Sequence, residues 1–303
     1  MPGWDLQLDQ ISQGAFSGWL TEARIGGLQV LRERVNRSLL KRGYGIGGAV
    51  SFCVPLRAMG HGSWAGGLLE ERMVLVSDQA QLSEIRTPPV QDLAIVSVPR
   101  AMLDAAAGLG GEGPMRGVRL VRIEAGEFAS LHAMLMGCLE AVGGNGSEAR
   151  SRRGHYHARK ALRDTLLLAM RDIACRREQV IRMPPSSRER LIAKVRELVA
   201  ANPDTPLSVL DVCRAVGASR RKLQYCFESM VGVNPAHYLR VVRLNAVRRE
   251  LLRVSDPAAT VSEVASRWGF WHLGRFAVNY RTLFGETPSG TLGIARARSA
   301  NRG

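Results

Sequence analysis

The sequence has few cysteines and no arrangement of them that favours disulfides. Its five cysteines are odd in number and scattered along 303 residues, with no C-x-x-C pair. They are Cys53, Cys138, Cys175, Cys213 and Cys226. A chain of this length buries enough apolar surface to fold without covalent cross-links. We therefore expect reduced, buried thiols and a cytoplasmic protein.

Long apolar runs are also missing. No segment approaches the roughly 18 consecutive apolar residues that a membrane-spanning helix needs. The first residues, Met1–Asp5, contain no basic region followed by an apolar stretch, which a secretory signal would require. We expect a protein that neither crosses a membrane nor is secreted.

The patterns that mark common enzymes are absent as well. There is no G-x-S-x-G, no H-E-x-x-H and no phosphate-binding G-x-x-x-x-G-K-[ST], and the chain has only six histidines. Residues 43–48 fit G-x-G-x-x-G, but a charged run precedes them and a predicted strand follows, whereas a dinucleotide site needs a strand before and a helix after. His61 has no metal-binding partner at a suitable spacing. We expect no enzymatic activity, no cofactor and no metal site.

Acidic residues are scarce relative to basic ones, and the imbalance is regional. The chain has 42 Lys and Arg against 27 Asp and Glu, a net charge of +15. Residues 1–149 carry 13 basic and 15 acidic groups, residues 150–185 carry 10 and 3, and residues 186–303 carry 19 and 9. Such an excess is typical of proteins that bind a polyanion. We expect the C-terminal half to make that contact.

The C-terminal region contains an internal repeat. Val212–Gly217 resembles Val264–Gly269, and four further positions match at a constant spacing of 53 residues. The matched pairs are Leu223 and Phe276, Phe227 and Tyr280, Gly232 and Gly285, and Pro235 and Pro288. The spacing indicates that one structural unit occurs twice.

Each copy has the start and stop signals of two short helices joined by a tight turn. A hydroxyl residue followed three positions later by a carboxylate predicts a helix start, and a glycine predicts a helix end. In the first copy, the first helix is expected to start at Ser208 with Asp211 and to end at Gly217, and the second helix to start at Ser219. In the second copy, the first helix is expected to start at Thr260 with Glu263 and to end at Gly269, and the second helix to start near His272. Each copy therefore predicts a helix-turn-helix.

The second helix of the first copy has a polar outward face, made of Arg220, Arg221, Gln224 and Tyr225. Arg and Gln side chains have the planar donor and acceptor groups that recognise guanine and adenine edges, and a helix N-terminus attracts phosphate. A solvated basic face is the alternative interpretation. The repeat, the turn glycines and the regional charge together favour DNA binding.

A long helix is predicted between the two copies. Asn234 followed by Pro235 is a typical helix start, and the helical pattern continues to Val254 with an apolar stripe. The stripe consists of Leu244, Val247 and Leu251, surrounded by Arg240, Arg243, Arg248 and Arg249. Such a helix would hold the two motifs at a fixed distance. If their second helices lie about one DNA turn apart, ~34 Å, both can enter successive major grooves on one face of the DNA.

Five short motifs close the second copy: Gly269-Phe270, Arg275-Phe276, Tyr280, Leu283–Gly285 and Thr287–Ser289. Through them the region resembles the DNA-binding domain of the AraC/XylS family of transcription regulators. The resemblance covers residues 188–292 and implies two helix-turn-helix units bridged by a long helix. It implies that Arg221, Gln224 and Tyr225 read bases, with Arg220 nearer the DNA backbone.

The second copy departs from the family pattern. Its reading face consists of Leu273, Gly274, Ala277 and Val278 around Arg275. Few of these side chains can hydrogen-bond to a base, so we expect contacts with thymine methyl groups and one contact from Arg275. Phosphate contacts are expected from His272, Asn279 or Arg281. Most sequence discrimination should then lie in the first unit.

The N-terminal half has the pattern of β-strands. Val50, Phe52, Val54 and Leu56 alternate with more polar residues, and short apolar runs recur at 73–76, 93–98 and 118–123. Glycines and prolines between these runs favour a small β-barrel or sandwich. Two apolar helices are expected at 128–142 and 155–181.

The expected fold class is α+β. A β-rich N-terminal domain with two trailing helices should occupy residues 1–181, and a linker residues 182–187. An all-α DNA-binding domain with two bridged helix-turn-helix units should occupy residues 188–292, followed by a basic tail at 293–303.

The resemblance implies a cytoplasmic transcription regulator, an activator rather than a repressor. Its N-terminal domain would bind a small-molecule effector or mediate homodimerisation, and its partners would be promoter operator DNA and RNA polymerase. The alternative function is that of a nonspecific architectural DNA-binding protein. The mixed face of Arg221, Gln224 and Tyr225 argues against it, because pure phosphate binding would favour lysines.

Overall fold

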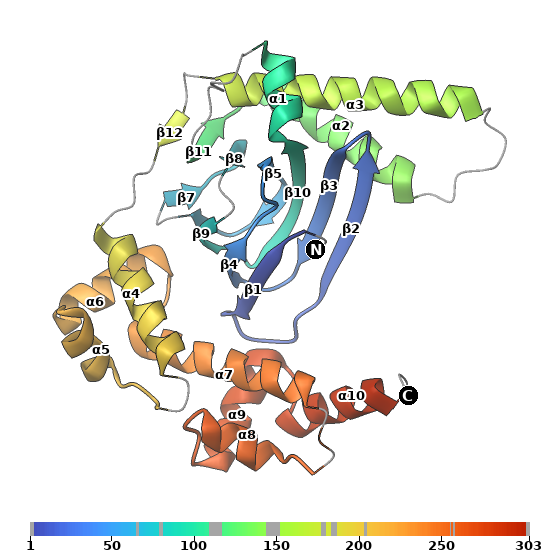
Figure 1. Cartoon of the computed structure of the whole chain (residues 1–303). Coiled ribbons are helices and arrows are strands. Elements are labelled where there is room, and N and C mark those ends of the chain that lie inside the picture. The colour runs from blue at the N-terminus through green and yellow to red at the C-terminus, as the bar shows by residue number, and fades with distance from the viewer. Residues whose placement is uncertain are drawn as a thin grey trace.

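The computed structural model shows β-sheets at the N-terminal end of the chain and a group of helices at the C-terminal end (Figure 1). It describes residues 3–64, 67–78, 81–108, 117–143, 152–176, 180–182, 187–202, 205–254, 256 and 258–300. The expected α+β class is confirmed.

Twelve strands of the described residues form two antiparallel sheets. One has five strands in the order β1-β4-β9-β6-β7, and the other has seven in the order β12-β11-β8-β5-β10-β3-β2. Neither sheet closes on itself, so of the two expected forms the structure has a sandwich-like arrangement and not a closed barrel. The strands are β1 (Asp5–Gln10), β2 (Gly18–Ile25), β3 (Leu28–Val35), β4 (Leu39–Tyr44), β5 (Ala49–Met59), β6 (Gly62–Trp64), β7 (Gly67–Leu69), β8 (Met73–Ser77), β9 (Gln81–Arg86), β10 (Val90–Pro99), β11 (Val118–Arg122) and β12 (Val180–Arg182).

The seven-stranded sheet is covered on both faces. In β5, Val50, Phe52 and Val54 are buried against the helices α1 (Arg100–Ala107), α2 (Ala125–Gly143) and α3 (Arg152–Cys175). Ser51 and Cys53, which alternate with them, face the five-stranded sheet. The period-2 pattern of the sequence therefore separates a helix-facing side from a side that lines the space between the sheets.

The second trailing helix is shorter than expected. It ends at Cys175, whereas the sequence predicts a helix to 181. Val180–Arg182 instead forms β12, which pairs antiparallel with Arg119–Val121 of β11. Val180 and Ile181 are β-branched and suit a strand, and pairing satisfies backbone groups along the edge of β11. This long-range pairing overrides the local helical pattern.

The cysteines are only partly as expected. All five are free thiols; Cys138, Cys213 and Cys226 are buried and Cys53 is half-buried. Cys175 at the end of α3 is exposed, so the expectation that every thiol is buried is wrong.

The helices of the two repeats begin where their sequence signals predict, and their first helices end within two residues of the predicted glycines. The C-terminal helices are α4 (Ser187–Ala201), α5 (Val209–Val216), α6 (Arg220–Met230), α7 (Pro235–Arg253), α8 (Val261–Arg267), α9 (Leu273–Phe284) and α10 (Pro288–Ala300). Ser208 and Thr260 both form complete capping boxes, and Gly217 ends α5 at φ 66°. α10 includes most of the expected basic tail. Among the described residues, no helix is both long and apolar enough to cross a membrane.

One core joins all these helices. Leu223, Phe227 and Tyr238 are almost fully buried in it, and the rings of Phe227 and Tyr238 meet edge to face with centroids 4.8 Å apart. Ile11 and Leu40 of the N-terminal half are buried in the same cluster. The helices and the sheets therefore share apolar packing.

We predict that Phe227→Ala lowers the free energy of unfolding by about 3–5 kcal/mol, because it leaves a cavity in this core. Urea unfolding followed by circular dichroism measures the change. Leu210→Ala, at a position 57% exposed on α5, is the control and should shift stability by less than about 0.5 kcal/mol. Equal effects of the two substitutions would contradict this packing.

Candidate nucleic-acid interface

The second helices of the two repeats are α6 and α9. Figure 1 shows the α5–α6 pair beside one end of α7 and the α8–α9 pair below it. The side chain of Ser219 accepts a hydrogen bond from the backbone of Lys222 and caps α6. His272 precedes α9 without a side-chain cap. Both repeats therefore have the predicted helix-turn-helix geometry.

The predicted reading face of α6 is fully accessible. Arg220, Arg221, Gln224 and Tyr225 are all exposed, while the opposite face buries Leu223 and its neighbours. The amide of Gln224 donates a 3.0 Å hydrogen bond to Glu228 one turn later. The four predicted residues thus lie together on the outer side of one helix.

Arg188 of α4 joins this face, although no local sequence pattern predicts it. Its guanidinium carbon lies 4.8 Å from the ring centroid of Tyr225, and it donates a 3.4 Å hydrogen bond to the tyrosine hydroxyl. This cation–π contact restricts the Tyr225 ring and adds positive charge beside it. Only the packing of α4 on α6 reveals the contact, because the two residues are 37 positions apart.

The predicted residues of the second unit lie on or next to α9. His272, Arg275 and Arg281 are exposed and Asn279 is half-buried. They are accompanied by a large exposed apolar surface made of Trp271 (69% exposed), Leu273 (42%) and Val278 (65%). Trp271 was missed, and its only sequence signal is a large apolar side chain just before the helix. The second unit therefore presents a more apolar face than the first.

Several arginines of α7 contact protein groups. Arg248 forms a 2.9 Å ion pair with Glu286 and lies over the ring of Phe284 at 5.2 Å. Arg243 lies 5.6 Å from the ring centroid of Phe270. Part of the positive charge that the sequence assigns to this region therefore stabilises the contact between α7 and the second unit.

The N-terminal sheets contact α7 through the end of β1. The side-chain oxygen of Asn245 accepts a 2.9 Å hydrogen bond from the backbone of Gln10, and its amide donates one of 2.9 Å to the carbonyl of the same residue. The fully buried carboxylate of Asp9 pairs with Arg42 at 2.9 Å and with Arg249 of α7. We call this set of contacts the β1–α7 junction.

The C-terminal ends of both recognition helices also contact the sheets. The hydroxyl of Ser63 donates a 3.1 Å hydrogen bond to Met230 at the end of α6. Near the end of α9, the side-chain amide of Gln10 donates a 2.6 Å bond to the carbonyl of Leu283. The outward faces stay exposed, so the sheets fix how the helices lie without covering them.

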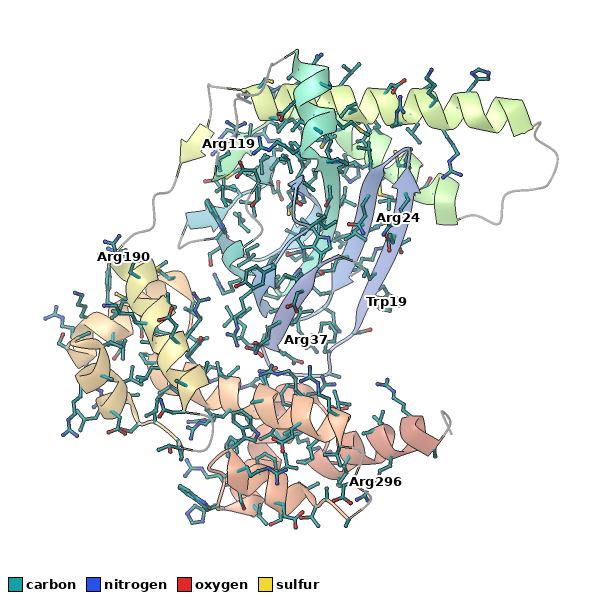
Figure 2. All side chains as sticks on the ribbon, in the orientation of Figure 1. Trp19, Arg24, Arg37, Arg119, Arg190 and Arg296 are labelled. Atoms are coloured by element: carbon teal, nitrogen blue, oxygen red, sulfur yellow. The ribbon has the colours of Figure 1, made fainter. Side chains whose placement is uncertain are left out.

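A glycine permits the contact beside α9. Gly285 has φ +72°, and a Cβ there would lie 2.6 Å from the backbone nitrogen of Ala15. Arg37 lies against the neighbouring Gly14, and Figure 2 shows it at the end of the sheets nearest α7. A larger residue at position 285 would separate the two parts.

Comparisons with known proteins give matches in sequence and in structure. A sequence model described as a helix-turn-helix domain matches residues 212–293. The chain is 41% identical over 96 residues to the probable thc operon regulatory protein of Rhodococcus erythropolis, covering 32% of this chain and 29% of that protein. Among solved structures, the AraC-like transcriptional activator CuxR aligns with a TM-score of 0.41 at 15% identity, over 88% of this chain and 92% of that one.

A second relative is covered over most of its length. The chain is 34% identical over 105 residues to the XylDLEGF operon transcriptional activator 2 of Pseudomonas putida, covering 35% of this chain and 67% of that protein. Residues 212–293, which the helix-turn-helix model matches, include α6, α7, α8 and α9. The chain belongs to the AraC/XylS family of transcription regulators.

Proposed function

We propose that this protein is a transcription activator that reads an asymmetric DNA site through α6 and α9. The observation that carries the proposal is the exposed face of Arg221, Gln224 and Tyr225 on the recognition helix of the first unit. Arg and Gln can each make bidentate contacts with purine edges in the major groove. Arg220 lies at the start of the same helix, where phosphate binding is favoured.

The second unit supplies a different kind of contact. Its apolar residues suit thymine methyl groups, Arg275 reads one base, and His272, Asn279 and Arg281 bind phosphates. We assign the DNA-binding domain to residues 188–292 and the N-terminal domain to residues 1–181. Of the expected linker at 182–187, Arg182 belongs to β12 and Ser187 to α4. The tail at 293–303 adds positive charge.

The N-terminal domain regulates DNA binding by restraint. The β1–α7 junction and the contacts at the ends of α6 and α9 hold the two recognition helices in one relative orientation. Release of these contacts lets the helices adjust to successive major grooves and meet RNA polymerase. An effector that binds the released state more tightly shifts the equilibrium toward it.

Further partners follow from the same function. A second copy of the chain, associating through the N-terminal domain, would place two DNA-binding domains on one promoter. The site of action is the cytoplasm, where thiols stay reduced and the genomic DNA of a bacterium lies.

The rival function is nonspecific architectural DNA binding. The test is to incubate the full chain with sheared DNA from its own organism at near-physiological salt and to sequence the retained fragments. An asymmetric motif upstream of a few genes supports the proposal, since specific binding exceeds nonspecific binding by ~10³ or more. Even recovery across the genome, with and without cell extract as a source of effector, would refute it.

We predict that Arg221→Ala weakens binding to the enriched site by about 10- to 100-fold, the loss of one bidentate base contact. Binding to random DNA should change little. Arg275→Ala should cost less specificity, and Arg24→Ala, at an exposed position on β2, should change neither. Fluorescence anisotropy with both DNAs measures this. Loss of specificity with Arg275→Ala but not Arg221→Ala would reverse the assigned roles.

We predict that Asn245→Leu raises operator affinity without effector, because it removes both hydrogen bonds to Gln10. The gain should lie in the range of about 5- to 150-fold that is typical of coupling between sites. Asn202→Leu is the matched control, since the hydrogen bond that its side-chain amide donates within the described residues goes to Leu198 of α4. Unchanged or weaker operator binding by Asn245→Leu would show that the junction does not restrain the helices.

A pH dependence follows from His237 at the start of α7. Burial lowers its pKa, as does the charge of Arg240, against a hydrogen bond to the backbone of Ile11 that raises it. The unfolded state therefore binds a proton more readily, and stability falls as pH drops through about 6.5, the ordinary value. Urea unfolding between about pH 7.5 and 5.5 should show a smaller loss for His237→Gln than for the natural chain. His157→Gln, exposed on α3, should keep the full loss, and an identical loss in all three proteins would contradict the assignment.

A further inference from the structure

A cavity lies between the two sheets of the N-terminal half. Its volume is about 510 Å³, which suits a small organic molecule. Strands of both sheets line it, and most of the lining is apolar. The apolar residues include Leu6, Met73, Leu75, Ile85, Leu93 and Ile95. The seven-stranded sheet thus turns one face to its helices and the other to this cavity.

The cavity wall contains one buried ion pair. Lys41 of β4 lines the cavity, and its ammonium pairs with the carboxylate of Glu33 on β3. Both side chains are less than 10% exposed. A buried charge is tolerated when an opposite charge compensates it, so Lys41 has its counterion within the protein. Beside the pair, burial raises the pKa of the Cys53 thiol to about 12, and this group stays neutral.

The other charged residues of the lining are mainly acidic. Glu70 and Glu71 line the cavity and are exposed, so they lie toward solvent. Glu70 forms a 2.7 Å ion pair with Arg122. Lys41 is the one Lys or Arg among the lining residues that the structure describes. An anionic ligand would leave water, find Lys41 already paired and pass the carboxylate of Glu71, which is unfavourable.

We propose that this cavity binds an uncharged, largely apolar small molecule. The inference rests on the proposed function, in which the N-terminal domain responds to an effector, and adds the chemical class of that effector. Apolar burial supplies the affinity, and the hydroxyls of Ser51, Ser77 and Thr87 in the lining offer polar contacts. The Lys41–Glu33 pair disfavours ligands with a net negative charge.

The cavity shares two strands with the β1–α7 junction. Leu6 lines the cavity from β1, and Asp9 and Gln10 at the end of that strand hold α7. On β4, Lys41 lines the cavity and the next residue, Arg42, pairs with Asp9. A ligand that moves either strand therefore acts directly on the contacts that restrain the DNA-binding helices.

The test compares two fluorescent probes that share one ring system. N-phenyl-1-naphthylamine is uncharged, and 8-anilinonaphthalene-1-sulfonate adds a negative charge. Titration of the full chain should show saturable binding of the uncharged probe, one per chain, at least tenfold tighter than the sulfonate. Equal or tighter binding of the sulfonate, or no saturable binding of the uncharged probe, would overturn the inference.

Charge variants locate the effect. Glu33→Gln leaves Lys41 without its counterion and should tighten sulfonate binding at least tenfold, whereas Glu22→Gln on β2 should not. If circular dichroism shows that Glu33→Gln fails to fold, Glu71→Lys at the exposed edge replaces it, with Glu140→Lys on α2 as control. Glu71→Lys should tighten sulfonate binding several-fold. If folded Glu33→Gln or folded Glu71→Lys binds the sulfonate no more tightly than the natural chain, the probe binds outside this cavity and the proposed site is refuted.

Operator binding by the same preparation separates the two proposals. Specific DNA binding without the expected probe preference refutes only the ligand class. The expected probe preference without specific DNA binding refutes the proposed function.

Discussion

The position of the DNA-binding helices depends on a carboxylate that has no access to water. Asp9 is completely buried, between Arg42 from its own sheet and Arg249 from α7. Taking a carboxylate out of water costs several kcal/mol unless cations and hydrogen bonds replace the solvent. Separation of the two halves would remove one of its two guanidinium partners. The contact between β1 and α7 therefore supplies part of the positive charge that compensates the buried carboxylate of Asp9.

The C-terminal helices were predictable because their signals are local. Ser208, Thr260 and Asn234 cap helices by hydrogen bonds to residues three positions away, and such spacing is visible in a sequence. The sheets were less predictable, because strand pairing joins distant residues. The local pattern predicts a helix that continues through Ile181, whereas Val180–Arg182 forms a strand because it pairs with β11. The order of strands follows from such pairings and leaves no pattern of its own.

The candidate site likewise contains residues that local sequence signals predict and residues that only tertiary contacts bring into it. The outward face of α6 follows from helical periodicity, which places Arg221 and Gln224 opposite the buried Leu223. Arg188 belongs to that face only through the packing of α4 on α6. For α7, the sequence overestimates the charge that is available to DNA. Charge composition cannot distinguish a guanidinium that contacts DNA from one that pairs with Glu286. Tertiary contacts make that distinction.

The strand β1 lines the cavity with one residue and holds α7 with two others. A change that displaces β1 at the cavity therefore also alters its contacts with α7. Thermodynamic linkage makes the coupling free energy between the two sites equal in both directions. In the proposed mechanism, a promoter that binds the released helices also favours the effector-bound state of the N-terminal domain. In that mechanism the concentration of effector that half-saturates the protein depends on the operator as well, so one cell can set different thresholds at different promoters with a single regulator.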